Sequence, residues 1–303
     1  MSPRARPGEV GLPRAFALVG AGRMGTALAL ALARKGLTPL GIHSRRASSM
    51  ERARALLGGG RIEADPAAAV KGAPLVLLGV PDDALAPLAD RLARLEVVER
   101  GSLWIHLSGF HGLEPLEPLA RKGARILGIH PLQTVPDPAE GPARLEGAWF
   151  SLAGAEEDLP LGEALVRLLG GRPARVAPEM RPLYHAAAVL ACNDLVALLH
   201  LASRLLERAS RGSLGWEALL PLVRATLESL EKFGPRGALT GPVARGDEKV
   251  VAGHRRVLEE AHRRAWQVYR LLGLEALDLL GEEGEESNTI ERILRDPDPP
   301  PPG

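Results

Sequence analysis

The sequence predicts an α/β fold with a doubly wound, mainly parallel sheet, followed by an all-helical C-terminal domain. First, three glycines separate a short apolar segment, 16–19, from a helix-forming segment, 26–33. Second, strand-like and helix-like segments alternate as far as residue 178, which is the pattern of a parallel sheet covered by helices. Third, the segments beyond that point are long, rich in Leu and Ala, and free of strand signals.

The glycines lie where the first predicted strand turns into the first predicted helix. In a Gly-x-Gly-x-x-Gly turn, Gly20 permits a tight bend, Gly22 lets the backbone approach a pyrophosphate, and Gly25 lets the helix pack closely on the strand. The helix start then offers free N–H groups to phosphates. The turn predicts a Rossmann-type dinucleotide-binding domain, with cofactor contacts from Gly20, Ala21, Gly22, Arg23, Met24 and Gly25.

The predicted dinucleotide-binding domain spans 15–178. Further strands are expected at 38–43, near residue 62, and at 74–80, 102–107 and 124–129. Helices are expected between them, beginning near Ser48, Ala64, Asp82 and Leu113. A helix at 158–169 lies between two more segments, 147–153 and 174–177, that extend this domain. Residues 1–14, rich in Pro, Arg and Gly, predict a flexible lead-in.

The second predicted domain, 179–281, is all-helical and serves substrate binding and dimerisation. Residues 182–210 are almost unbroken Ala, Leu and Val and predict a rod of roughly 40 Å that is apolar on nearly every face. Such a helix must be wrapped by other helices or by a partner subunit. Helices at 216–233, where Pro221 can kink the chain, and at 247–280, with a break at Gly273, follow. The acidic and then proline-rich segment 282–303 predicts a disordered tail.

Composition limits the partners and the compartment. The chain is 46% hydrophobic and 25% charged, as in globular proteins, and its formal charge of +1 offers no excess to attract nucleic acid or an anionic membrane. Charges or prolines interrupt each apolar run, so no membrane span is expected. The single cysteine, Cys192, cannot form an internal disulfide, and the N-terminus lacks an apolar signal segment. We expect a cytoplasmic protein, and we expect no metal site.

The end of the second predicted strand indicates which dinucleotide binds. NAD enzymes place an acidic residue there on the ribose hydroxyls, whereas this chain reads His43-Ser44-Arg45-Arg46. A hydroxyl and guanidinium groups can bind a 2′-phosphate through charge-assisted hydrogen bonds, so Ser44, Arg45 and Arg46 favour NADP(H). The alternative is that both arginines are solvated surface charges.

Polar residues follow three more strands at the carboxyl edge of the sheet, where doubly wound folds bind ligands. Val80, Pro81 and Asp82 are expected to touch the cofactor, although Pro81 and Asp82 also suit a helix start. The next two strands end with Ser108 and Gly109, and with His130, Gln133 and Thr134; these residues are expected near the nicotinamide and substrate. His130 is the more suggestive histidine, ahead of His106 and His111, and a structural hydrogen-bonding role is the alternative for each.

The long apolar helix carries polar residues that need partners. On a 3.6-residue repeat His185 and Asn193 lie two turns apart and within a quadrant of each other, so both could face one cleft. His185 is then a candidate proton donor, and Asn193 a candidate to orient the substrate. Alternatively, His185 bonds a carbonyl near the helix start and Asn193 bridges helices. Cys192 is more typical of a small core residue than of a nucleophile.

The loop 238–247, between the last two long helices, contains residues with special backbone roles. Asp247 is expected to cap the following helix, and Thr240 and Arg245 could bind a carboxylate or phosphate of a substrate. A purely structural hairpin is the alternative.

These motifs resemble a family that pairs a Rossmann-like domain with a C-terminal helical domain of unknown function, within the group of pyrroline-5-carboxylate reductases and 6-phosphogluconate dehydrogenase-like proteins. The resemblance covers about residues 15–280. It rests on the glycine run and on the motifs Gly79-Val-Pro-Asp-Asp83, Gly128-Ile-His-Pro-Leu-Gln-Thr134, Tyr184-His-Ala-Ala-Ala188 with Asn193, and Leu239-Thr-Gly-Pro-Val-Ala-Arg-Gly-Asp247.

The resemblance implies an NADP oxidoreductase, sometimes deazaflavin-dependent, that dimerises through its helical domain. One departure concerns the catalytic lysine that beta-hydroxyacid dehydrogenases carry on the first long helix of this domain. This helix contains no lysine; His185 stands roughly in its place, and Asn193 lies a turn further along than the matching asparagine.

The expected function is an NADP(H)-dependent reductase that acts on a small carbonyl or imine acid in an interdomain cleft. In this hypothesis His185 supplies the proton, Asn193 and Thr240 orient the substrate, Arg245 binds its carboxylate, and His130 or Gln133 closes the site. The alternative is a non-enzymatic NADP(H)-binding sensor or scaffold, which the missing lysine favours.

Overall fold

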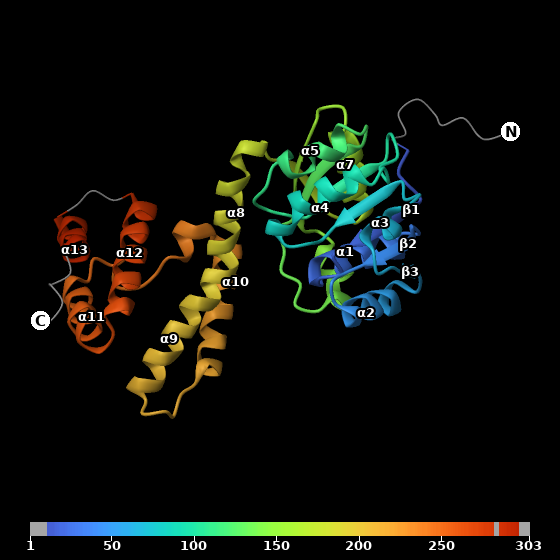
Figure 1. Ribbon diagram of the computed structural model, residues 1–303. Helices are drawn as coiled ribbons and strands as arrows, with labels where there is room; N and C mark the ends of the chain where they lie inside the picture. The colour runs from blue at the N-terminus through green and yellow to red at the C-terminus, as the bar shows by residue number, and fades with distance from the viewer. Residues whose placement is uncertain (1–10, 282–284, 297–303) are drawn as a thin grey trace, which may run out of the picture. The chain divides into compact units, whose positions relative to one another are not determined.

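The computed structural model describes residues 11–281 and 285–296, and the chain divides into two compact units (Figure 1). The first unit ends at Asn193 and the second begins at Asp194. This division falls inside a turn of π-helix, η4 (Leu190–Asp194), between the helices α8 (Arg181–Val189) and α9 (Leu195–Ala209). The predicted single helix 182–210 is therefore not regular throughout.

The first unit is built on one eight-stranded sheet with the order β3-β2-β1-β4-β5-β6-β7-β8. All neighbouring strands run parallel except β6 and β7, so the predicted doubly wound, mainly parallel sheet is confirmed. The order reverses between β1 and β4, which places a ligand crevice at their carboxyl ends. The strands are β1 (Ala15–Val19), β2 (Thr38–His43), β3 (Arg61–Ile62), β4 (Leu75–Leu78), β5 (Leu103–His106), β6 (Arg125–Pro131), β7 (Trp149–Gly154) and β8 (Arg172–Arg175).

Helices cover both faces of this sheet, and the alternation of side chains along each strand explains why. In β1, Phe16 and Leu18 join one buried cluster, whereas Ala17 and Val19 join another on the opposite face. The first cluster packs beneath α1 (Arg23–Arg34), α2 (Ala47–Leu57), α6 (Gly141–Leu145) and α7 (Leu159–Leu168). The second packs beneath α3 (Pro66–Val70), α4 (Asp82–Arg94) and α5 (Glu117–Ala120). Short 3₁₀ turns complete the unit: η1 (Glu114–Leu116), η2 (Pro138–Glu140) and η3 (Pro178–Met180).

The described part of the second unit is helical and contains one small buried cluster. Val251, Trp266, Ile290 and Leu294 form it, from the last three helices. The elements are α9, the 3₁₀ turn η5 (Trp216–Leu219), α10 (Leu220–Ala238), α11 (Glu248–Ala261), α12 (Arg263–Leu280) and α13 (Glu285–Arg295). By contrast, α10 has no buried residue at all.

Three expectations for this unit differ from the structure. Pro221 lies in the first turn of α10, where its missing N–H costs nothing, and α10 instead departs from helical geometry at Gly234. The last long helix breaks at His262, which caps α12, and not at Gly273, which packs against Leu294. The tail predicted to be disordered contains α13 over part of its length.

The helix α13 forms because its apolar residues share one face. Ile290 and Leu294 are one turn apart and fully buried against α11 and α12, so their burial offsets the polar composition of the segment. Residues 282–284 and 297–303 of the predicted tail, and 1–10 of the predicted lead-in, lie outside the described residues.

The helical segment Pro178–Ala209 is long and apolar enough, by length and composition, to cross a membrane. Its most apolar stretch has a mean hydropathy of 1.6, and 6% of the residues in that stretch are buried. The expectation that no run reaches this length is therefore wrong, because Asp194 is the one charged residue between Arg181 and Arg204.

Candidate functional site

The predicted glycine turn brings three glycines into direct contact. The N–H of Gly20 donates to the carbonyl of His43, and that of Gly79 donates to the carbonyl of Val19, so the turn is bonded to both neighbouring strands. Gly20 has a φ of +94°, and a Cβ built on it would lie 2.4 Å from the carbonyl carbon of Gly79. A Cβ on Gly25 would lie 2.6 Å from the oxygen of Gly20. Only glycine fits these positions.

Gly22 differs from its neighbours because it faces open space. The nearest atom to a Cβ built there is the Gly79 oxygen, at 3.7 Å. Nothing in the packing requires glycine here, so the missing side chain leaves room above the backbone. This room fits the close approach of a pyrophosphate, which the turn predicts.

A cleft of about 840 Å³ opens at this turn, within the range of small-molecule sites. Thirteen of the fourteen predicted cofactor residues line it, and Gly109 is the exception. The thirteen are Gly20, Ala21, Gly22, Arg23, Met24, Gly25, Ser44, Arg45, Arg46, Val80, Pro81, Asp82 and Ser108. The sequence reading missed other lining residues, among them Gly79, Ser49 and Arg91.

Two helix N-termini face this cleft without a side-chain cap. The residues before α1 and α2 are Gly22 and Arg46, and neither makes a capping hydrogen bond from its side chain. Neither helix has an acidic residue in its first turn. The free N–H groups and the helix dipoles therefore favour anions at both places.

Positive charge gathers at the end of β2. Arg45 and Arg46 line the cleft there, and Arg91 approaches from α4, where it forms a 2.8 Å ion pair with Asp65. Among the described residues that line the cleft, Asp82 is the single carboxylate, and it follows β4, not β2. This end of the cleft is thus suited to a phosphate, and it lacks the acidic residue that binds an unphosphorylated ribose.

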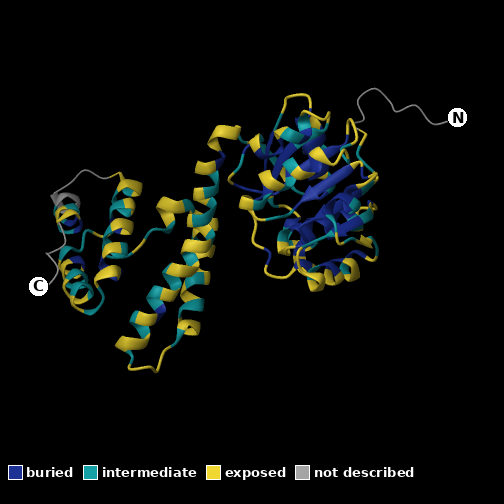
Figure 2. Ribbon diagram, in the orientation of Figure 1, coloured by how far each residue is buried: buried dark blue, intermediate teal, exposed yellow. Residues whose placement is uncertain are grey.

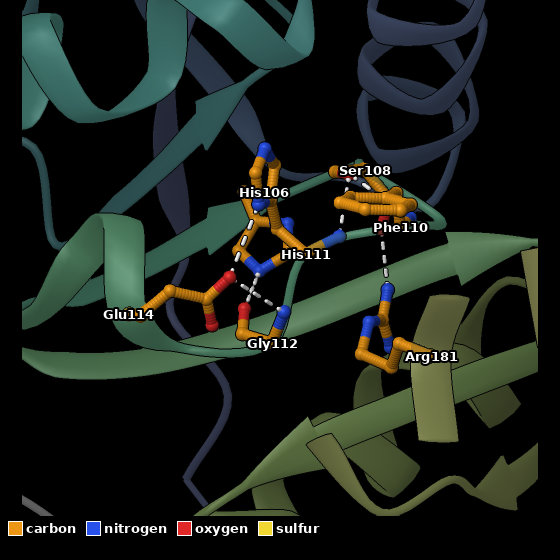
Figure 3. Close-up of polar contacts among 7 residues, drawn as sticks. All are labelled: His106, Ser108, Phe110, His111, Gly112, Glu114 and Arg181. Carbon is orange, nitrogen blue, oxygen red and sulfur yellow. Dashed lines mark hydrogen bonds and ion pairs between the residues drawn. The ribbon is translucent and has the colours of Figure 1, made fainter. Parts of the chain in front are cut away.

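The loop after β5 is tied down by its own polar groups (Figure 3). The hydroxyl oxygen of Ser108 accepts hydrogen bonds from the N–H groups of Phe110 and His111, at 3.1 and 3.0 Å. Nε2 of His106 lies 2.6 Å from the carbonyl oxygen of Gly112, so the ring N–H donates to it. Ser108 is thereby fixed where it lines the cleft.

His106 is a structural residue of this loop. Its side chain is fully buried, and its Nδ1 has no hydrogen-bond partner. Burial, followed by the positive charge of Arg181, lowers the pKa of His106 to about 4. The ring is therefore neutral near pH 7, with its proton on Nε2 for the bond to Gly112.

Arg181, the first residue of α8, is fully buried beside this loop. Its guanidinium donates to the carbonyl oxygen of Ser108 (Figure 3) and, at 3.2 Å, to the hydroxyl of Ser151. No carboxylate among the described residues forms an ion pair with it, and its Nε has no partner. Arg181 therefore fastens the start of α8 to the sheet edge and keeps an unneutralised charge there.

Two histidines meet above Gly109. A Cβ built on Gly109 would lie 2.5 Å from Nδ1 of His185 and 3.0 Å from Nε2 of His130, so both rings rest on this glycine. The ring centroids of His130 and His185 are 5.7 Å apart, edge to face. The structure thus brings together His130, from β6, and His185, from α8, next to the cleft-lining Ser108.

Nδ1 of His130 lies 3.0 Å from the hydroxyl oxygen of Tyr184, a hydrogen-bond distance. Burial, then the charges of His185 and Arg181, lowers the pKa of His130 to about 4. Burial raises the pKa of Tyr184, against a hydrogen bond with Ser151 and the charge of Arg181, which lower it. Near pH 7 the phenol is protonated and the imidazole of His130 is neutral.

The other predicted substrate residues do not join this group in the first unit. The amide of Gln133 is engaged with its own loop: it donates to the carbonyl of Arg144 and accepts from the N–H of Thr134. Asn193 is exposed in the π-helical turn, so the regular repeat that aligned it with His185 does not hold. Thr240 and Arg245 are exposed in the second unit, and their roles stay predictions.

The sequence reading missed Arg181, Tyr184 and Ser151 as members of this site. Arg181, Tyr184 and His185 have the spacing i, i+3, i+4, which places them on one helix face, and this spacing was the available signal. The helix that the sequence predicts begins at Pro182, so Arg181 lies outside it. Ser151 gives no such signal, because its place beside His130 depends on how β7 pairs with β6.

Two family models match the chain, one to each part. A Rossmann-like domain matches residues 6–131, and the domain of unknown function DUF2520 matches residues 148–276. No curated protein matches the sequence.

Several solved structures share the arrangement of the chain. A Bacteroides fragilis protein, provisionally named an NADP oxidoreductase, is 25% identical with a TM-score of 0.70 over 87% of this chain and 98% of its own. A Thermotoga maritima protein is also 25% identical, with a TM-score of 0.67 over 88% of this chain and 98% of its own. A pyrroline-5-carboxylate reductase from Coxiella burnetii shares the fold at 18% identity, with a TM-score of 0.55 over 93% and 99%. The chain is thus similar to Rossmann-like domains in its first part and to DUF2520 in its second part.

Proposed function

We propose that this protein is an NADP(H)-dependent oxidoreductase that reduces a small carbonyl or imine acid. The observation that carries the proposal is the cleft of the first unit, which joins an arginine-rich end at β2, a glycine turn, and Ser108 beside two histidines. Proteins that share the fold support the general class: the named relatives include an NADP oxidoreductase and a pyrroline-5-carboxylate reductase.

The residues of the cleft fit a phosphorylated dinucleotide. Arg45 and Arg46 would hold the 2′-phosphate, and the room above Gly22 and the free N–H groups of α1 would hold the pyrophosphate. Val80, Pro81 and Ser108 would then lie towards the nicotinamide, because they follow β4 and β5 at the carboxyl edge. When bound, the reduced nicotinamide supplies a hydride to the substrate carbon.

The substrate would bind against the carboxyl edge, near Gly109, His130 and His185. These groups supply hydrogen bonds in a partly buried place, and the buried charge of Arg181 favours an acidic substrate over a basic one. His185 is the proton donor that the sequence predicts. Binding of Thr240 and Arg245 to the substrate's carboxylate belongs to the same hypothesis.

Calorimetric binding of NADPH and NADH tests the cofactor site. We expect NADPH to bind more tightly, and Arg45→Ala and Arg46→Ala each to weaken NADPH by about 1–3 kcal/mol with little effect on NADH, because each removes a charge-assisted contact to the phosphate. Arg52→Ala is the matched control, since Arg52 is an exposed arginine of α2 that does not line the cleft.

The outcomes separate the parts of the proposal. Equal binding of the two nucleotides would remove the NADP preference, and binding of neither would remove the cofactor site. A screen of small 2-oxo acids and cyclic imine acids for NADPH oxidation then tests the enzyme. Tight NADPH binding with no turnover of any of these would favour the non-enzymatic sensor.

We also propose that the protein is a cytoplasmic homodimer that associates through its helical part. Val196, Leu222 and Phe233 are each more than half exposed, and they lie on helices with almost no buried residues. Large apolar side chains that are exposed together mark surfaces that bind a partner. A second copy is favoured over a membrane because α9 also carries Arg204 and Arg208 among its apolar residues.

A further inference from the structure

The first turn of α8 presents three polar side chains to the carboxyl edge of the sheet. Arg181, Tyr184 and His185 share one helix face, and each contacts a different group there. The guanidinium of Arg181 binds the carbonyl of Ser108, the Tyr184 hydroxyl binds Nδ1 of His130, and the His185 ring rests on Gly109. Burial raises the pKa of Tyr184, so its phenol holds its proton at neutral pH.

The surroundings of the Tyr184 oxygen suit a phenolate. His130 approaches it at 3.0 Å, and with its hydrogen on Nδ1 the ring would donate to the oxygen and leave the phenol hydrogen free. The hydrogen bond with Ser151 and the positive charge of Arg181 both lower the pKa of Tyr184 against burial, so both stabilise the charged form. A phenol in this position is protonated at rest, and its conjugate base has three stabilising neighbours.

The guanidinium of Arg181 has two hydrogen-bond acceptors, the Ser108 carbonyl and the Ser151 hydroxyl, but no carboxylate pairs with it among the described residues. A buried guanidinium without a carboxylate is costly. Among the groups that favour its charged form, the Tyr184 oxygen ranks first, ahead of Glu114 and Asp82. The charge becomes neutralised when a negative charge forms on Tyr184.

We propose that Tyr184 donates the proton in the reduction, and that Arg181 is a positioning residue that aims Tyr184 and stabilises its phenolate. This inference rests on the proposed function and changes the donor within it from His185 to Tyr184. Among the described residues, Nδ1 of His185 is buried without a hydrogen-bond partner, whereas the Tyr184 hydroxyl has one in His130.

In this step the hydride would come from the reduced nicotinamide, whose C–H bond breaks as NADP⁺ forms. The substrate carbon of a C=N or C=O group accepts a hydride, and its nitrogen or oxygen takes the proton as the O–H bond of Tyr184 breaks. A C–H bond and an N–H or O–H bond form in the product. The Tyr184 phenolate then regains a proton from water.

The chain provides its own control. It has two tyrosines, and Tyr269 of the second unit lies 2.9 Å from Nδ1 of His254, with the same edge-to-face ring geometry as Tyr184 and His130. Burial alone raises the pKa of Tyr269, without the opposing arginine and serine that surround Tyr184. The two pairs share their hydrogen bond and differ in what surrounds it.

The first test uses the absorbance of phenolate and needs no substrate. The Tyr269→Phe protein has Tyr184 as its single tyrosine, and we titrate it with saturating NADP⁺ and, separately, with NADPH. If Tyr184 is next to the nicotinamide, the positive ring of NADP⁺ should lower its midpoint by about one pH unit relative to NADPH. The Tyr184→Phe protein, which reports Tyr269, should titrate alike with both.

Equal midpoints of Tyr184 with the two nucleotides, when calorimetry shows that both bind, would overturn the inference and leave the cofactor site intact. If neither nucleotide binds, the proposed function fails, and the inference fails with it. Calorimetry on the same samples therefore distinguishes the two failures.

The second test concerns Arg181. In the Tyr269→Phe background, Arg181→Gln should raise the midpoint of Tyr184 further, and Arg181→Lys should restore part of the difference, because a lysine keeps the charge. A purely structural arginine would move stability and leave the midpoint unchanged, which would contradict the positioning role. Ser151→Ala, which removes only a hydroxyl, should also raise the midpoint and serves if the buried arginine cannot be replaced.

The third test is turnover of the substrate found by the screen. Tyr184→Phe should lower kcat by about 100-fold or more, with NADPH affinity unchanged, as expected for loss of a general acid. Tyr269→Phe should retain kcat. A full rate in Tyr184→Phe together with a lost rate in His185→Ala would return the donor role to His185.

Discussion

The first unit buries most of the residues of its sheet, whereas most residues of the helices α9 and α10 in the second unit are exposed or half-buried (Figure 2). On the sheet, two clusters of buried residues occupy the two faces. In the described part of the second unit, α11, α12 and α13 contain six buried residues, while α10 contains none and α9 only Ser203.

This difference indicates which contacts stabilise each unit. A parallel sheet must be covered on both faces, and the connections between its strands supply the covering helices from the same stretch of chain. The helices α9 and α10 are apolar on surfaces that their own unit leaves open. The sheet of the first unit is covered on both faces by helices of the same unit. On our proposal, a second copy covers the apolar surface of the second unit.

The substitution that should lower the free energy of unfolding most lies in the first unit, at Gly20. Alanine there would need a φ of +94° and would bring its Cβ within 2.4 Å of backbone that is bonded to the sheet, so Gly20→Ala should lower the free energy of unfolding by more than about 4 kcal/mol. Gly22→Ala is the control: with no atom closer than 3.7 Å it should keep the wild-type Tm but lose NADPH affinity. Thermal unfolding and calorimetry measure both; a wild-type Tm for Gly20→Ala would contradict the packing argument.

The next effect should appear in the second unit, at Val196 and Leu222, each 66% exposed. If a second copy covers them, the double variant Val196→Glu, Leu222→Glu should fall from twice 32.2 kDa to a single chain in sedimentation, because two charges would be buried without partners. Leu95→Glu, on the first unit and also exposed, should leave the mass unchanged.

A wild-type protein that sediments as a single chain would contradict the dimer. Binding of the single chain to vesicles of neutral and anionic lipid then tests whether a membrane contacts the apolar surface. Binding through the segment Pro178–Ala209 that is lost in the double variant would assign this surface to a membrane.

The same difference explains what the sequence could predict. Local patterns predict the strands of the first unit, because glycine, proline or charged residues bound each apolar run. The order of the strands and helices then predicts the sheet and its carboxyl edge. In the second unit the apolar pattern is nearly continuous, so it does not show where a helix changes. The sequence therefore does not predict the π-helical turn at 190–194 or the break at His262.

The candidate site divides in the same way. Residues of the cleft follow strands in one sheet, so strand order alone places Gly20, Val80 and Ser108 at one edge. The group around Tyr184 requires β7 to pair with β6 and α8 to return to that edge. The position of Arg181 depends on contacts between segments that are far apart in the sequence. In the sequence itself, Arg181 is one of many arginines.

The two units should also differ in how their stability depends on pH. His106 and His130 have a pKa of about 4 in the folded protein and about 6.5 when unfolded, so between these values the unfolded chain binds protons that the folded one does not. The free energy of unfolding is therefore fully retained above pH 6.5 and falls as the pH drops towards 4, by up to about 3 kcal/mol for each histidine. His106→Gln should remove part of this slope, whereas His200→Gln, an exposed histidine of the second unit, should not. Hydrogen exchange at pH 7 and pH 5 should show the loss in β5 and β6 and leave α11 and α12 unchanged; equal loss in both units would mean that these buried histidines do not set the acid response.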